Sequence, residues 1–176
     1  MSRTTTEQTP TQAAPLRKGG NPLHAPIAHV AIGSYTTGLV CDILSVARVG
    51  GDGTQHDLFR AGTFSFMIAT ATLFVAVAAG LIDRSRYTSA GTKQRRKTNI
   101  HMTIMLSLGV IAIVDIVIRR HAADTDVRTP VGVLVLSVVV GVLLFFGGRY
   151  GGRLVYRLGV GTAAGAPKAA GASEAG

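Results

Sequence analysis

Ionisable side chains lie within or at the ends of the long apolar stretches of this sequence. In residues 21–45, His24 and His29 lie near one end, Asp42 lies near the other, and Tyr35 lies between them. An ionisable side chain inside a bilayer costs about 2.5–3.5 kcal/mol on insertion scales, so it needs a packed or hydrated environment. These positions are therefore the first candidates for a functional site.

Depth along the apolar stretches divides the ionisable residues into two layers. The first layer contains three histidines and one aspartate: His24, His29, Asp83 and His101. Two histidines from different helices could ligate a b-type haem or serve quinone chemistry. Histidines together with Asp83 could hold a divalent metal, or could pass protons, because imidazole titrates near neutral pH. Histidines at helix ends also serve as simple hydrogen-bonding groups at the headgroups, so the pattern leaves these alternatives open.

The second layer contains Asp42 and Asp115. Structural pairing is the expected role of this layer, either with the Tyr35 hydroxyl or with an arginine at the boundary. The candidate arginines are Arg48, Arg119 and Arg120.

Helical phase separates the two histidines of the first stretch. At 100° per residue, His24 shares a face with Tyr35 and Asp42, whereas His29 falls about 140° away. His101 shares a face with Asp115 in the same way. We therefore take His24 and His101 as the candidate haem or metal ligands and His29 as a secondary candidate. No catalytic residue is predicted, and the identity of any metal stays open.

Four apolar stretches must position these residues. The chain has 176 residues, of which 47% are hydrophobic, and its mean hydropathy is +0.36. Apolar blocks of about 20 residues are typical of transmembrane helices. The predicted fold is all-α, an integral membrane four-helix bundle in residues 21–160 between disordered tails, residues 1–20 and the Ala/Gly-rich residues 161–176. The expected spans are residues 25–46, 61–82, 101–118 and 130–146.

Two boundaries of these spans follow from local composition. Glycine pairs, Gly147-Gly148 and Gly151-Gly152, are expected to break the fourth span. A basic loop containing Lys93, Arg95, Arg96 and Lys97 is expected to connect the second span to the third.

Charge and cysteine content exclude several classes of function. The net charge is +9, but the basic residues flank apolar spans, so anionic lipid headgroups are the expected partners, not nucleic acid. Lys and Arg gather beside the termini and the second connection, which predicts cytoplasmic termini in a plasma membrane. The single cysteine, Cys41, excludes an intrachain disulfide, a C-x-x-C-H haem site and a four-cysteine iron–sulfur site. No nucleotide-binding or metalloprotease motif is present, so an enzyme is not the expected class.

Short motifs along the chain resemble a bacterial membrane family known as domain of unknown function 2231. The motifs are Pro22-Leu23-His24-Ala25-Pro26, Ile32-Gly33-Ser34-Tyr35, Asp42-Ile43-Leu44, Gly80-Leu81-Ile82-Asp83, Asn99-Ile100-His101 and Gly151-Gly152-Arg153-Leu154-Val155-Tyr156 with Gly159. The resemblance covers residues 22–160. Ala25, Tyr35 and Leu158 depart from it, standing where proline, tryptophan and histidine are common.

The resemblance implies a four-helix membrane protein and selects His24, Asp42, Asp83 and His101. Some members of that family carry a fused Rieske-type or cytochrome c domain, which implies a connection with membrane electron transfer. We therefore expect a non-enzymatic accessory subunit linked to redox chemistry, acting with a redox partner protein or as a homo-oligomer. The alternatives are a b-haem- or quinone-binding electron-transfer protein and a small proton- or metal-handling protein.

Overall fold

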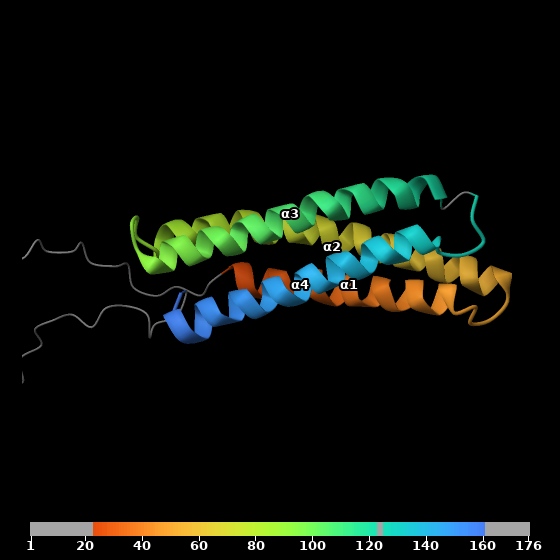
Figure 1. The fold of residues 1–176 in the computed structure, drawn as a ribbon, viewed down its shortest axis with the longest axis horizontal. Helices are drawn as coiled ribbons and strands as arrows, with labels where there is room; N and C mark the ends of the chain where they lie inside the picture. Colours follow the sequence, from red (N-terminus) through yellow and green to blue (C-terminus); the bar gives the residue numbers. More distant parts are fainter. Residues whose placement is uncertain (1–22, 123–124, 161–176) are drawn as a thin grey trace, which may run out of the picture.

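The computed structural model describes residues 23–122 and 125–160. Four helices follow one another in this part of the chain: α1 (His24–Val46), α2 (Asp52–Tyr87), α3 (Lys93–Ala122) and α4 (Val131–Leu158). They lie side by side in one elongated bundle, with the start of α1 and the end of α4 at the same end (Figure 1). The predicted all-α four-helix membrane fold is confirmed. The two tails predicted to be disordered lie outside the described residues.

The surface of the bundle is apolar, whereas its interior contains charged side chains. Val110, Val131 and Phe145 are more than half exposed, and many other aliphatic side chains share the surface with them. Asp42 and Arg119, by contrast, are completely buried. Lipid chains solvate an apolar surface, so this distribution suits a protein that is surrounded by a bilayer. All four helices are long and apolar enough to cross a membrane.

The helices extend beyond the apolar stretches that predicted them. α2 has 36 residues, which at 1.5 Å per residue is about 54 Å, longer than the hydrocarbon core of about 30 Å. The predicted basic loop at Lys93–Lys97 is wrong, since these residues form the first turns of α3. Hydropathy marks only the part of a helix that lies in lipid, and the backbone hydrogen bonding continues past it.

The glycine pairs Gly147-Gly148 and Gly151-Gly152 do not end α4, contrary to the sequence-based expectation. The helix continues through both pairs to Leu158. It ends at Gly159, whose φ of 65° lies in the left-handed region that glycine adopts readily. Glycine is tolerated inside a membrane helix because the backbone has no water to bond with and stays helical.

The glycines of α4 act as packing positions. A Cβ atom added at Gly147 would come within 1.9 Å of the Met105 Cε atom of α3. Small residues of this kind let membrane helices approach closely. A glycine also allows close approach of α1 to α2, since a Cβ at Gly38 would lie 2.8 Å from the Phe66 ring.

Helix pairs are packed unequally. α1 packs most extensively on α2, and α4 packs mainly on α3, whereas α1 and α4 have fewer contacts. The Tyr35 hydroxyl joins α1 to α4 by donating a 2.5 Å hydrogen bond to the Ser137 carbonyl. The Tyr35 ring meets Phe66 of α2 edge to face, with 4.5 Å between ring centroids.

Candidate functional site

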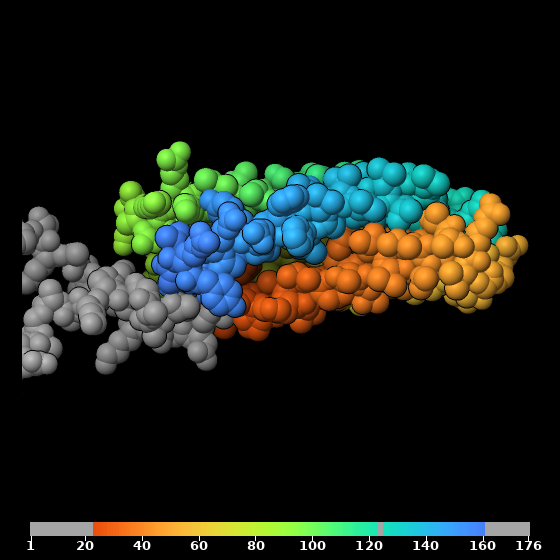
Figure 2. Space-filling view, turned by 60° about the horizontal axis from the view of Figure 1, so that its bottom comes forward, coloured from red at the N-terminus to blue at the C-terminus, as the bar shows by residue number. Residues whose placement is uncertain are grey.

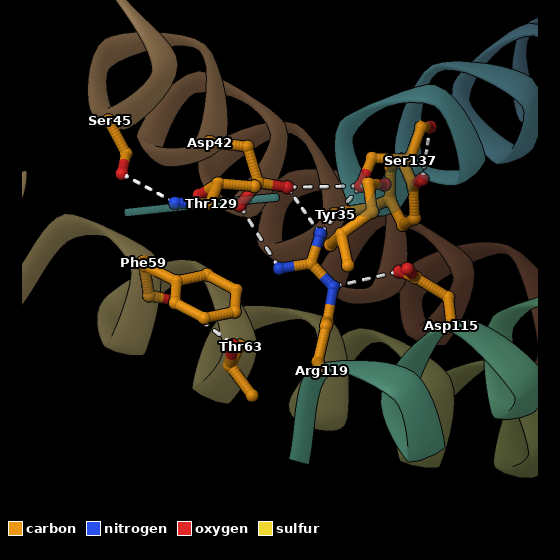
Figure 3. Close-up of polar contacts among 10 residues, drawn as sticks. Tyr35, Asp42, Ser45, Phe59, Thr63, Asp115, Arg119, Thr129 and Ser137 are labelled. Carbon is orange, nitrogen blue, oxygen red and sulfur yellow. Dashed lines mark hydrogen bonds and ion pairs between the residues drawn. The ribbon is translucent and has the colours of Figure 1, made fainter. Parts of the chain in front are cut away.

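A buried polar cluster, here called the arginine cluster, lies where α1 and α3 finish and α4 begins (Figure 3). Its members are Asp42, Asp115, Arg119, Thr129 and Ser137, each at most 2% exposed. The Arg119 guanidinium bonds to both carboxylates. Its Nε donates to Asp115 Oδ2 at 2.8 Å, its Nη1 donates to Asp42 Oδ1 at 3.0 Å, and its Nη2 donates to Asp42 Oδ2.

Hydroxyl groups complete the arginine cluster. Arg119 Nη2 also donates to Ser137 Oγ at 2.5 Å, and Ser137 Oγ lies 3.0 Å from Asp42 Oδ2. Thr129 Oγ1 donates to Asp42 Oδ1 at 3.2 Å. The guanidinium carbon lies 4.0 Å from the centroid of the Phe66 ring, a cation–π contact. The cluster therefore ties α1, α3 and α4 together and rests on α2.

One atom of the arginine cluster is an exception. Asp115 Oδ1 is buried and has no hydrogen-bond partner among the described residues. Of the three arginines considered from the sequence, Arg119 is the one that pairs with the aspartates. Tyr35 donates to the Ser137 carbonyl, not to a carboxylate as considered. Sequence reasoning missed Ser137 and Thr129, although Ser137 is the single hydroxyl in the apolar stretch 131–146.

A cavity, here called the histidine cavity, lies at the opposite end of the bundle. It has a volume of about 360 Å³, and all four helices line it, with His24, Asp83, Thr98 and His101 among the lining residues. The rings of His24 and His101 meet edge to face, with 6.0 Å between centroids and an angle of 85° between planes. The structure thus brings the two principal candidate histidines together. The Tyr150 ring of α4 lies parallel to the His101 ring, with 6.5 Å between centroids.

Neighbouring helices fix the position of His24. Its Nδ1 lies 2.7 Å from the Ala76 carbonyl of α2, which can only accept, so Nδ1 carries the hydrogen. A neutral His24 ring therefore keeps its lone pair on Nε2. The backbone N–H of His24 donates to Asp83 Oδ2 at 3.0 Å, so a carboxylate from α2 stabilises the N-terminus of α1. Gly80 leaves room for the ring, since a Cβ there would lie 3.2 Å from His24 Nδ1.

The orientation of His101 is set by α4. A Cβ atom at Gly151 would lie 3.0 Å from His101 Cε1, 3.5 Å from its Nε2 and 3.6 Å from its Nδ1, so the Cε1 corner of the ring faces the α4 backbone. His101 Nδ1 is buried and has no hydrogen-bond partner among the described residues. The glycine that was expected to end a helix instead provides the space for a candidate ligand-binding side chain.

Unpaired polar atoms are concentrated at the histidine cavity. Asp83 Oδ1, Thr98 Oγ1 and His101 Nδ1 are all buried without a hydrogen-bond partner in the described part of the chain, and all three residues line the cavity. A buried polar group without a partner costs about 1–3 kcal/mol, so such atoms are rare in native structures. The residues that carry these atoms line one hollow, so a bound molecule that reached the atoms would supply the missing hydrogen bonds.

The remaining sequence-based candidates fit this site less well. His29 lies at the edge of the cavity but is exposed, and its Nδ1 bonds to the Ala25 carbonyl of its own helix at 2.6 Å. The described residues hold no group of three His, Cys, Asp or Glu side chains placed to bind a metal ion. Thr98 was not identified from the sequence, where it is one of many threonines.

Comparison with known proteins identifies the family. No curated protein and no solved structure matched the chain. A protein family described as predicted membrane protein (DUF2231) matches residues 20–164, a region that includes both the histidine cavity and the arginine cluster. The chain therefore belongs to the DUF2231 family of membrane proteins.

Proposed function

We propose that this protein binds a quinone in the histidine cavity and serves as a membrane subunit in electron transfer with a partner redox protein. The observation that carries the proposal is that three unpaired buried polar atoms belong to residues that line one cavity of about 360 Å³. This volume lies within the usual range for small-molecule sites, about 300–1,000 Å³.

The unpaired groups match both redox forms of such a ligand. A quinone carbonyl accepts hydrogen bonds, which the Thr98 hydroxyl and a histidine N–H can donate. A quinol hydroxyl donates hydrogen bonds, which Asp83 Oδ1 and the lone pair of a neutral histidine can accept. Reduction of a quinone to a quinol takes two electrons, supplied by an iron–sulfur or haem protein, and two protons. Asp83 and the histidines lie where they can hold those protons.

A b-type haem is the second candidate, favoured by His24. Ligating histidines almost always donate their other ring N–H to a carbonyl or carboxylate, as His24 does to Ala76. His101 does not show the same arrangement, since its Nδ1 has no carbonyl or carboxylate partner among the described residues. A single-ring head group therefore fits the geometry better than a macrocycle held between both histidines.

Quinone binding is tested with purified protein in lipid nanodiscs. We expect about one isoprenoid quinone per protein above the empty-nanodisc background, and at least tenfold weaker binding in His101→Leu. His121→Leu is the matched control, because His121 lies exposed at the other end of the same helix and should bind as the unmodified protein does. Circular dichroism verifies that the variants are folded. Equal quinone in loaded and empty nanodiscs would refute the proposal.

An absorption spectrum separates the two candidates. If protein from haem-replete cells shows a Soret band that disappears in both His24→Leu and His101→Leu, the ligand of the cavity is haem and not quinone. A colourless preparation that still binds quinone supports the first candidate.

The membrane and orientation are part of the proposal. We infer that the protein resides in a bacterial plasma membrane with both termini in the cytoplasm. The support is the clustering of Lys and Arg beside the termini and at the start of α3, where Lys93 and Lys97 also suit anionic headgroups. A C-terminal fluorescent-protein fusion should fluoresce, and an alkaline phosphatase fusion at the same position should be inactive. The reverse pattern would place the termini outside.

A further inference from the structure

A second hollow runs along the outside of the bundle between α1 and α4 (Figure 2). This groove has a volume of about 690 Å³ and an almost entirely apolar lining, with Arg149 as its one charged residue. Its floor includes Leu39 and Gly141, where a Cβ at Gly141 would already touch the Leu39 side chain at 3.5 Å. The groove therefore offers an apolar path on the face of the bundle that lipid reaches.

The groove and the histidine cavity are adjacent. Ile32 of α1 and Leu144 and Gly148 of α4 line both. A Cβ atom at Gly148 would meet nothing within 4 Å, so the space beside this residue, which lines both hollows, is open. The Tyr35 hydroxyl bond to Ser137 joins α1 and α4 beside the groove and keeps the two helices together there. One elongated molecule could thus lie with a polar end in the cavity and an apolar end in the groove.

We propose that the groove holds the isoprenoid tail of the quinone and admits the molecule sideways from the bilayer. This inference rests on the proposed function of the histidine cavity, and it narrows the ligand to a long-tailed membrane quinone. The head group then satisfies the polar atoms of Asp83, Thr98 and His101, while the tail covers the apolar lining between α1 and α4.

The charges of the cavity favour a quinone over a phospholipid as occupant. The carboxylate of Asp83, with its unpaired Oδ1, would repel a phosphate headgroup. The arginine among the residues that line the cavity, Arg84, already uses its Nε to bond Asn99 Oδ1 at 2.7 Å. An uncharged ring that both accepts and donates hydrogen bonds meets no such repulsion.

The test compares a long-tailed quinone with its tailless analogue in nanodiscs of fixed lipid composition. Gly148→Leu adds a side chain at a residue that lines both hollows. Gly132→Leu is its control, since a Cβ at either glycine of α4 meets nothing within 4 Å and Gly132 lies outside the groove. We expect Gly148→Leu to weaken binding of the long-tailed quinone at least tenfold and that of the tailless quinone less than twofold. Gly132→Leu should leave both unchanged.

Other outcomes separate this inference from the proposed function. If Gly148→Leu weakens the binding of both quinones equally, or of neither, the proposed path for the tail is refuted. The head-group site still stands in that case if His101→Leu abolishes binding of the tailless quinone. If neither quinone binds the unmodified protein, both proposals fail. A phospholipid seen by native mass spectrometry that is lost in Gly148→Leu, with quinone binding unchanged, would assign the groove to that lipid instead.

Discussion

The two polar regions of this bundle are built from similar residue types but differ in how completely they are paired. In the arginine cluster, Arg119 and Asp42 bond to each other and to surrounding hydroxyls, and no side chain of the cluster is more than 2% exposed. At the histidine cavity, three polar atoms have no partner within the described residues, and the residues that carry them line a hollow. A paired buried network specifies how helices pack, whereas an unpaired one leaves bonding capacity for another molecule.

The contrast shows that burial alone does not identify a functional residue in a membrane protein. Asp42 is buried more deeply than His24, and it was equally conspicuous in the sequence. What distinguishes the two positions is the supply of partners. Arg119 lies within reach of Asp42, while no described side chain reaches the unpaired atoms of Asp83 or His101.

The largest effect should come from removing the arginine. Arg119→Leu leaves two buried carboxylates without their cation, which costs about 3–5 kcal/mol for a broken buried pair. The measurement is the unfolding free energy in mild detergent titrated with a denaturing detergent. Arg120→Leu is the matched control, because the adjacent side chain is exposed and should change little. Equal unfolding midpoints for the two variants would show that the cluster contributes nothing to stability.

The two aspartates of the arginine cluster should respond unequally. Asp42 accepts hydrogen bonds from Arg119, Thr129 and Ser137, whereas Asp115 accepts from Arg119 alone and has one unpaired oxygen. Asp42→Asn should therefore cost about 3 kcal/mol of unfolding free energy, and Asp115→Asn less than about 1 kcal/mol, because the Asp42 carboxylate serves three donor side chains and the Asp115 carboxylate serves one. The same detergent titration ranks the two, and a reversed order would contradict this account of the cluster.

The smallest effect should be a gain in stability at the histidine cavity. Thr98→Val replaces an unpaired buried hydroxyl with a methyl group, which should raise the unfolding free energy by about 0.5–1 kcal/mol while weakening quinone binding. Thr63→Val is the control, because the Thr63 hydroxyl donates to the Phe59 carbonyl at 2.9 Å and its loss should not stabilise. If Thr98→Val is less stable than the unmodified protein, the hydroxyl has a structural partner.

Sequence reasoning identified the helices more reliably than their ends. Apolar runs predicted four helices because lipid allows only structures that satisfy their own backbone. The ends of α4 and α3 were misplaced because Gly147 and Lys93 are poor markers of helix termini when a helix packs through its glycines or extends into water. Gly159, with its positive φ, is the residue that ends α4.

By itself, the sequence determined that the chain forms four membrane helices and which face of each helix is polar. Periodicity placed His24 with Tyr35 and Asp42, and His29 away from them, because side-chain direction in a helix follows from residue number alone. Only the tertiary structure decided which polar faces find partners. Arg119 reaches Asp42 across 77 residues, and His101 lies beside His24 across a similar separation. Such contacts depend on how the helices pack against one another, which residue spacing within one helix does not encode.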